Sequence, residues 1–290
     1  MVELWSLGGL SLWQLLRRTA RETWQDSVFG QGGRMAFYQF LALFPSLLVL
    51  LAVAARMPHV GGSIKRLLQD LLVQVLPSQG AHLIADTVDE LTGRAASGFQ
   101  CVVVCAGALW AGCNATWAMV FGLNRAYEVQ ERRPWWQLGL TIGGLTLSLA
   151  LTGCIALFLI FAGADVESRF HIGAPAFRIM EWLVLLFLLS FSFVLLYRFA
   201  PNLRDPEWRC STPGAVCALA LWLGATLAAR IYFDRFDDYS RAYGHLNGVV
   251  TLLLWLYVTN GAILIGGEMN SEIRKAVRVL ASPAEKSGTG

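Results

Sequence analysis

The sequence predicts an all-α integral membrane protein with six transmembrane helices. Six apolar stretches, each roughly 20 residues long, recur at fairly even spacing, and a helix rising about 1.5 Å per residue needs that length to cross a bilayer core. The composition agrees, because 56% of the residues are hydrophobic and 15% are charged, whereas soluble domains carry about 25% charge. A soluble fold is therefore not expected.

The six predicted spans cover residues 36–55, 99–123, 138–163, 179–199, 214–229 and 249–267. The first is the clearest, because Arg34 and Arg56 bracket a run without charges. Pro45 lies inside this run and is expected to kink the helix, since proline removes a backbone hydrogen bond. Spans and short connections use nearly the whole chain, so residues 1–280 are predicted to form one membrane domain, followed by a flexible tail at 281–290.

Residues 1–35 are predicted to form a cytoplasmic segment at the membrane interface. Helical spacing places an apolar face, with Leu12, Leu15, Leu16 and Trp24, opposite a basic face with Arg17, Arg18 and Arg21. Such a helix lies at the lipid headgroups or, as an equal alternative, packs on the end of the bundle.

The connection at 56–98 is predicted to be extracytoplasmic and carries two amphipathic patterns. Over 64–76, apolar residues recur three and four apart, and Pro77 ends the pattern. Ser78 can cap a second helix over about 80–91. Neither helix is long enough to span a bilayer, so both are expected on the outer face of the bundle, as a simple cover or as a lid over a cavity.

The positions of the basic residues predict the orientation. If the N-terminus is cytoplasmic, that side holds 14 of the 23 Lys and Arg residues, namely Arg17, Arg18, Arg21, Arg34, Arg125, Arg132, Arg133, Arg198, Arg204, Arg209, Arg274, Lys275, Arg278 and Lys286. Cytoplasmic loops are enriched in basic residues. Both termini are therefore predicted to be cytoplasmic.

Polar groups inside the predicted spans need partners, because an unpaired polar group in hydrocarbon is costly. The main ones are Gln39, Asn114, Thr116 and Asn124. We expect them to form hydrogen bonds between helices, with contact to a substrate as the alternative; Gln39 and Asn114 are the candidates deepest in the membrane.

Glu268 is the most informative acid, since it lies at the cytoplasmic end of the sixth predicted span. Two interpretations stay open: an ion pair with Arg125, Arg198 or Arg274 at the membrane edge, or contact with an ion or a lipid headgroup. Residues at three span ends are predicted to ring a cytoplasmic vestibule, namely Asn124, Arg125, Tyr127, Arg198, Glu268 and Asn270.

Several motifs resemble one known family. In chain order, over about residues 25–280, they are MAFYQFLALFPSLLVLLA, LWAGCNATWAMVFGLNRAYEVQERRPW, LLYRFAPN, STPGAVCALALWLGATLAARIYF and YSRAYGHLNGVVTLLLWLYVTNGAILIGGEMNSEI. With these motifs the chain resembles the YihY/BrkB family of bacterial inner-membrane proteins. The resemblance implies a six-span protein of the bacterial inner membrane, associated in some members with virulence or serum resistance, whose biochemical activity is unsettled.

The same family was long labelled ribonuclease BN, and the sequence argues against that activity. The enzyme of that name needs a His-rich dinuclear metal cluster, whereas the four histidines here, His59, His82, His171 and His245, lie far apart in the chain. The six cysteines match no metal-binding spacing. We therefore expect no catalytic, cofactor-binding or metal-binding residues, no enzyme activity, and no nucleic-acid partner.

Three classes of function stay open. The leading one is a transporter, flippase or scramblase for a lipid or an amphipathic small molecule, which is not ATP-driven because the chain has no phosphate-binding loop. The alternatives are a non-catalytic scaffold of an envelope complex and, third, a membrane enzyme. A deep cavity between the third, fifth and sixth spans would favour transport. Membrane lipids are the expected partners, and glycines such as Gly139 and Gly143 allow a homo-oligomer.

Overall fold

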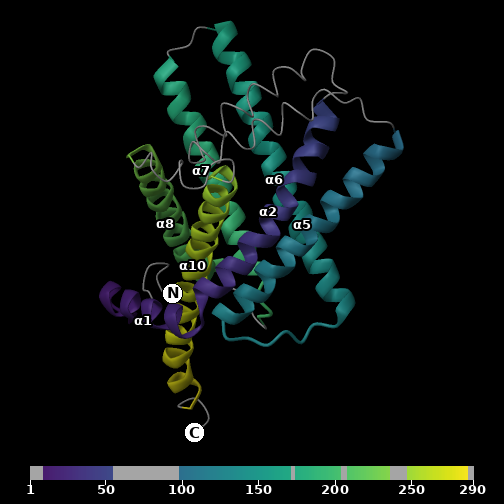
Figure 1. The fold of residues 1–290 in the computed structure, drawn as a ribbon. Coiled ribbons are helices and arrows are strands. Elements are labelled where there is room, and N and C mark those ends of the chain that lie inside the picture. Colours follow the sequence, from purple (N-terminus) through teal and green to yellow (C-terminus); the bar gives the residue numbers. More distant parts are fainter. Residues whose placement is uncertain (1–8, 55–97, 171–173, 204–207, 236–246, 287–290) are drawn as a thin grey trace.

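The computed structural model of the chain describes residues 9–54, 98–170, 174–203, 208–235 and 247–286. Within these residues all regular structure is helical. The helices are α1 (Leu12–Gln25), α2 (Val28–Ala54), α5 (Gly98–Ala126), α6 (Trp135–Phe170), α7 (Ala174–Phe199), α8 (Trp208–Arg235) and α10 (Asn247–Lys286) (Figure 1). The predicted all-α class is thus confirmed for the described chain.

Four of the described helices are long and apolar enough to cross a membrane. By length and composition, these spans are Trp135–Leu159, Ile179–Phe199, Ser211–Ile231 and Asn247–Val279. The first two leave large apolar side chains such as Leu147, Phe158 and Phe187 exposed, by 62%, 66% and 68%. Continuous apolar surface of this kind is typical of helices that face lipid. The chain is therefore a helical membrane protein, while the count of six spans stays a prediction.

The six long helices all extend beyond the predicted spans, and α2, α8 and α10 show this most clearly. α2 begins at Val28 and continues through Pro45, and α8 begins at Trp208 and continues through Pro213. α10 ends at Lys286, well past the predicted span end and inside the segment expected to be a flexible tail. The predicted span ends at Gly267 because the charged Glu268 follows, whereas α10 keeps packing through Ile273 and Ala276, which are 5% and 9% exposed.

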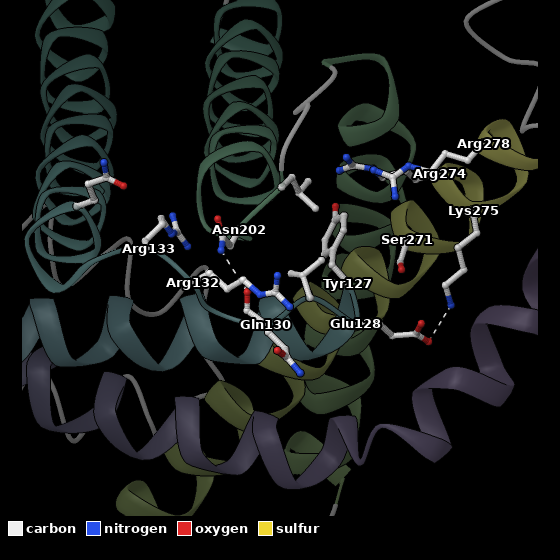
Figure 2. Close-up of a pocket in the computed structure, with 13 residues that line it drawn as sticks. Tyr127, Glu128, Gln130, Arg132, Arg133, Asn202, Ser271, Arg274, Lys275 and Arg278 are labelled. Carbon is white, nitrogen blue, oxygen red and sulfur yellow. Dashed lines mark hydrogen bonds and ion pairs between the residues drawn. The ribbon is translucent and has the colours of Figure 1, made fainter. Parts of the chain in front are cut away.

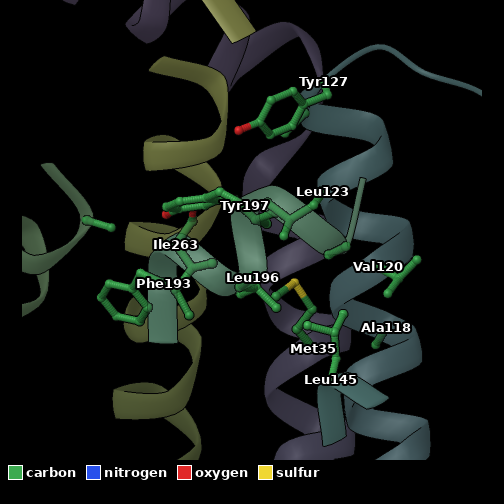
Figure 3. Close-up of a cluster of buried hydrophobic side chains, with 14 of the residues drawn as sticks. Met35, Ala118, Val120, Leu123, Tyr127, Leu145, Phe193, Leu196, Tyr197 and Ile263 are labelled. Carbon is green, nitrogen blue, oxygen red and sulfur yellow. The ribbon is translucent and has the colours of Figure 1, made fainter. Parts of the chain in front are cut away.

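The buried core lies where α2, α5, α7 and α10 meet. α2 lies against α5 and α10, α10 lies against α8, and α7 contacts both α6 and α8. Figure 3 shows part of the core cluster, in which Met35, Leu123, Leu196, Tyr197 and Ile263 are buried together. In a membrane, such contacts stabilise the bundle through close packing, because lipid tails are as apolar as the side chains.

α8 and α10 approach each other closely at two glycines. A Cβ atom on Gly214 would overlap the carbonyl oxygen of Gly266, and one on Gly266 would overlap the Tyr197 hydroxyl. That hydroxyl donates a hydrogen bond to Ile263 O at 2.6 Å. Asn270 Oδ1 accepts a hydrogen bond from Gly214 N at 2.7 Å in the same contact. The absence of a side chain at both glycines lets the two backbones come this close.

α1 begins with a capping box and packs on α10. Ser11 Oγ accepts from Gln14 N at 3.2 Å, and Gln14 Oε1 accepts from Ser11 N at 3.1 Å. Leu15 is fully buried against Met269 and Ile273. The other apolar side chains of α1 that were assigned to one face, Leu12, Leu16 and Trp24, are exposed. α1 thus packs on the bundle through one face, and its placement at the headgroups stays a prediction.

The predicted loop helices at 64–76 and 80–91 lie outside the described residues, as do all four histidines. In the described chain, α1, the connection between α5 and α6, and the last turns of α10 lie at one end of the molecule (Figure 1). We call this end the α1 end.

Candidate functional site

Hydrogen bonds at the α1 end fix the connection between α5 and α6. Asn124, near the end of α5, is 4% exposed. Its Nδ2 donates to Glu131 Oε2 at 2.8 Å, and its Oδ1 accepts from Asn202 N at 2.8 Å. Asn202 Nδ2 donates in turn to Gln130 O at 3.2 Å. One buried amide thereby joins the end of α5 to the residues that follow α7.

Glu131 and Arg133 form a two-point ion pair in this connection. Arg133 Nε donates to Glu131 Oε1 at 2.9 Å, and Arg133 Nη2 donates to Glu131 Oε2 at 2.7 Å. The same Nη2 donates to Ala200 O at 2.7 Å, just past the end of α7. Burial alone would raise the pKa of the Glu131 carboxyl, but hydrogen bonds from Arg133 and Asn124 outweigh it and hold that pKa below its ordinary value of 4.5.

Beside these residues lies a pocket of about 860 Å³, shown in Figure 2. Its lining is strongly basic, with Arg132, Arg133, Arg274, Lys275 and Arg278 against a single acid, Glu128. Uncharged polar groups come from Tyr127, Gln130, Gln137, Asn202 and Ser271. We call it the basic pocket; it is formed by the α5–α6 connection, the start of α6, the residues after α7, and α10.

The basic side chains of this pocket differ in their partners. Arg133 is held by Glu131, and Lys275 Nζ lies 2.8 Å from a carboxylate oxygen of Glu128 and 2.8 Å from one of Glu272. Arg132 and Arg278 are exposed and form no ion pair within the described part of the chain. These two guanidinium groups are therefore the ones best placed to meet an anion in the basic pocket.

A second pocket, of about 470 Å³, adjoins the basic pocket on the side of α6 and α7. The two share Arg133, Asn202 and Leu203, and the second adds Arg198. Its other lining residues are mostly apolar groups of α6 and α7. The lining is therefore mostly basic in the basic pocket at the α1 end and mostly apolar in the second pocket along α6 and α7.

A third pocket, of about 290 Å³, follows further along the same helices. Leu149 of α6 and Leu196 of α7 line it, next in sequence to residues of the second pocket. Its two hydroxyls, Thr152 and Ser192, donate to carbonyl oxygens four residues earlier in their own helices, so the surface they present is apolar. We call the second and third pockets together the α6–α7 groove. It runs along the third and fourth predicted spans, and Met119 of α5 and Ile263 of α10 also line its third pocket, so the predicted cavity of the third, fifth and sixth spans is matched at the third and sixth but not at the fifth.

Of the six residues predicted to ring a vestibule, two line pockets and two are buried in packing contacts. Tyr127 lines the basic pocket. Arg198 lines the α6–α7 groove, where its guanidinium lies 5.5 Å from the centre of the Phe199 ring. Asn124 and Asn270 are buried and bind backbone groups of neighbouring segments. A ligand-binding role for these residues stays a prediction.

Arg125 and Glu268, the other two, do not pair with each other. Arg125 Nε instead lies 3.2 Å from Asp26 Oδ1. Glu268 is 1% exposed, and its Oε1 has no hydrogen-bond partner among the described residues. The predicted ion pair between Glu268 and Arg125 is therefore not formed.

The predicted polar contacts inside the bundle are formed in part. Gln39 of α2 exchanges hydrogen bonds with Asn260 of α10, and Thr146 Oγ1 of α6 donates to Thr116 Oγ1 of α5 at 2.8 Å. The expectation of contacts between helices is thus confirmed for Gln39 and Thr116. It is wrong for Asn114, whose Nδ2 donates at 2.8 Å to the carbonyl four residues earlier in α5, because that carbonyl lies within reach of the short side chain.

Sequence reasoning counted Arg132 and Arg278 only as signals of orientation and missed their shared pocket. A signal was present on α10, because Arg274 and Arg278 are four residues apart and share a helical face. It also missed Asn260, an amide inside the sixth predicted span. No sequence signal marked Ser271 or Asn202 as pocket residues.

Fold and pocket define a helical membrane protein with a basic pocket at one end of its bundle. The chain belongs to the family described as Virulence factor BrkB, whose sequence model matches residues 19–289. This confirms the resemblance inferred from the motifs. No solved structure matches the chain.

Its curated relatives carry two kinds of name. The chain is 28% identical over 252 residues to the ribonuclease-like protein YfkH of Bacillus subtilis (strain 168), covering 84% of this chain and 90% of YfkH. It is 24% identical over 260 residues to a UPF0761 membrane protein of Pseudoalteromonas atlantica, covering 86% and 82% of the two chains. It is 27% identical over 264 residues to the UPF0761 membrane protein VSAL_I2938 of Aliivibrio salmonicida, covering 86% and 79%. The family is thus one of membrane proteins whose activity is unsettled.

Proposed function

We propose that this chain is a six-span inner-membrane protein that binds a phospholipid or a similar amphipathic anion and moves it along the α6–α7 groove. The observation that carries the proposal is the meeting of a basic pocket with an apolar groove: the pocket holds Arg132 and Arg278, and the groove begins at Arg198. A lipid has the same division of chemistry, with an anionic headgroup and apolar chains.

The basic pocket suits a phosphate headgroup. Basic pockets between membrane helices on the cytoplasmic side bind anionic headgroups, and each Lys or Arg near the surface contributes about 1 kcal/mol to attraction of anionic lipid. Arg132 and Arg278 lack ion-pair partners within the described residues and offer planar, bidentate donors to phosphate oxygens. Tyr127 and Ser271 add hydroxyl donors at the same pocket.

The α6–α7 groove suits an acyl chain. Its third pocket is lined by leucine, methionine, phenylalanine, alanine and isoleucine side chains together with a glycine and two hydroxyls bound to their own helices. Both bordering helices carry candidate spans with exposed apolar side chains, so a chain in the groove stays next to the lipid phase. Without a phosphate-binding loop in the sequence, movement would be facilitated or coupled to an ion gradient.

The proposal places the α1 end, and with it both termini, in the cytoplasm. This orientation follows the positive-inside rule, since the basic pocket is built from residues already assigned to that side. The exposed Leu12, Trp13, Leu16 and Trp24 would then enter the cytoplasmic headgroup layer from α1. Oligomerisation stays a prediction.

A nuclease activity is not part of the proposal, although one relative carries a ribonuclease-like name. The chain has no pair of histidines at motif spacing. The pocket that the structure does supply is basic at one end and joins an apolar groove, which is the chemistry of an amphipath rather than of a hydrolytic metal centre.

Mass spectrometry of lipids that co-purify in mild detergent tests the binding step, with an unrelated six-span protein prepared identically as the reference. We expect selective enrichment of anionic phospholipid. The double variant Arg132→Gln/Arg278→Gln should lower lipid affinity by about 25-fold, since each arginine contributes about 1 kcal/mol and 1.4 kcal/mol corresponds to tenfold.

The matched control is Arg17→Gln/Arg21→Gln, which removes two exposed positive charges from α1 at the same end but outside the pocket. It should keep most of the enrichment. A bulk-membrane lipid profile for the unchanged protein, or equal losses in both double variants, would refute a specific headgroup site and favour the scaffold alternative.

A further inference from the structure

Three carboxylates from two separate segments meet at the α1 end. Glu22 lies in the last turn of α1, Asp26 caps its C-terminus, and Glu128 follows α5. One carboxylate oxygen from each can be chosen such that all three lie within 4.8 Å of one another. At such distances, like charges repel strongly unless a cation lies between them.

Glu268 adds a fourth carboxylate, and it is buried. It is 1% exposed, and its Oε1 receives no hydrogen bond from any described residue. Glu268 lies close enough to Asp26, Glu22 and Glu128, and to Lys275, for their charges to act on it. Asp26 Oδ2 is likewise buried without a hydrogen-bond partner among the described residues. An ionised carboxylate oxygen in such a place needs a donor or a cation.

The ion pairs formed nearby involve only some of these acids. Arg125 pairs with Asp26, Lys275 pairs with Glu128 and Glu272, and Arg18 lies 4.0 Å from Glu272. These three cations are thus shared among Asp26, Glu128 and Glu272, and neither Glu22 nor Glu268 forms an ion pair with a described residue.

The backbone adds negative potential. Glu22, Asp26 and Glu128 all lie at the C-terminal ends of helices, where the unpaired carbonyl groups carry partial negative charge and basic residues are normally favoured. Glu128 also has a φ of 51°, in the left-handed region that ordinarily selects glycine or asparagine. Acidic side chains at these positions destabilise the helix ends unless a cation compensates their charge.

We propose that Glu22, Asp26 and Glu128 coordinate a hard divalent cation, Ca²⁺ or Mg²⁺, with Glu268 as the buried carboxylate behind it. Carboxylate oxygens are the ligands that these ions prefer. Two ligands on opposite sides of a Ca²⁺ are about 5 Å apart for bonds of 2.3–2.6 Å, so oxygens within 4.8 Å of one another fit one ion. The ion would join α1 to the end of α5 and to α10. This inference does not depend on the proposed lipid function.

Isothermal titration calorimetry of the full-length, chelator-treated protein in lipid-free detergent, with CaCl2 and separately with MgCl2, tests the site. We expect saturable binding near one ion per chain and a melting temperature that rises with ion concentration. Glu22→Gln and Glu128→Gln should each weaken binding at least tenfold. Glu128 is half exposed, so its variant is expected to fold even where Glu268→Gln does not.

Lys275→Met supplies a test of opposite sign. Lys275 Nζ forms an ion pair with Glu128 Oε1 at 2.8 Å and so competes with a cation for this oxygen. Its removal should therefore tighten cation binding. Glu181→Gln is the control, because Glu181 lies on α7 about 27 Å from the end of that helix at Phe199. Arg132→Gln/Arg278→Gln should also leave cation binding unchanged, which separates this inference from the lipid site.

Two results would overturn the inference. One is the absence of saturable binding of either ion to the unchanged protein. The other is binding by Glu22→Gln and Glu128→Gln that equals binding by Glu181→Gln, which would show that any ion binds elsewhere.

Discussion

Gln39 of α2 and Asn260 of α10 exchange two hydrogen bonds across the bundle. Gln39 Nε2 donates to Asn260 Oδ1 at 3.1 Å, and Asn260 Nδ2 donates to Gln39 Oε1 at 2.7 Å. Asn260 has no exposed surface, and its Nδ2 also donates to Leu256 O at 2.8 Å. Two amides separated by 221 residues in sequence thus satisfy each other where water is scarce.

Gln39→Leu should destabilise the bundle by about 0.6–1.7 kcal/mol, the range measured for polar contacts between membrane helices. The cause is the Asn260 amide, which loses its partner in a buried site. Unfolding in a mixed-detergent titration measures it, and Asn114→Leu is the control because, among the described residues, Asn114 bonds only within α5. If Gln39→Leu/Asn260→Leu is no more stable than the sum of both single changes predicts, the two amides are not coupled.

Gly266→Ala should destabilise the protein by about 1–3 kcal/mol, the usual cost of forcing extra volume into a packed contact. The new methyl group would overlap the Tyr197 hydroxyl and the Gly214 carbonyl oxygen, and must separate α8 from α10. Gly261→Ala on the same helix meets no atom within 4 Å and should be neutral or slightly stabilising. Melting temperatures of the two variants compare them directly, and equal values would show that the close approach is not needed.

The sequence predicted the helices well because length and hydropathy are local properties. It predicted that Gln39 needs a partner, yet nothing local to residue 39 identifies Asn260, since the pairing depends on how α2 lies against α10. Gly266 is likewise an ordinary glycine in the sequence. Its role follows only from the position of Tyr197 on another helix.

The candidate site was predicted less completely than the fold. Asn124, Tyr127 and Asn270 do lie near the α1 end, but they have different roles. The buried Asn124 and Asn270 accept hydrogen bonds from backbone N–H groups, whereas Tyr127 lines the basic pocket. Hydropathy cannot predict that Arg133 forms an ion pair with Glu131 while its neighbour Arg132 forms none among the described residues. Which member of a basic cluster remains available depends on the geometry of the connection.

Acid should weaken the α5–α6 connection through Glu131. Its pKa is lower in the folded chain than its ordinary value of 4.5, so its contribution to stability is fully present above about pH 4.5 and is lost as the pH falls through the folded pKa. Glu131→Gln should lower the melting temperature at pH 7 and flatten its decline between pH 5 and about pH 3. Thermal unfolding across this range measures it, with Glu181→Gln as the control. An unchanged slope would mean that the ion pair with Arg133 contributes little.

Gly153→Leu should slow movement of lipid while leaving headgroup binding intact. Gly153 lines the apolar part of the α6–α7 groove, and a Cβ atom there meets nothing within 4 Å, so we expect a leucine side chain to enter the 290 Å³ pocket and fill part of it. Gly139→Leu, on the same helix and equally open but outside the pocket, is the matched control. Transfer of a fluorescent phospholipid between leaflets of proteoliposomes measures movement. We expect at least a fivefold slower rate for Gly153→Leu only, and equal rates in both variants would exclude the groove as the path, because a filled groove cannot hold an acyl chain.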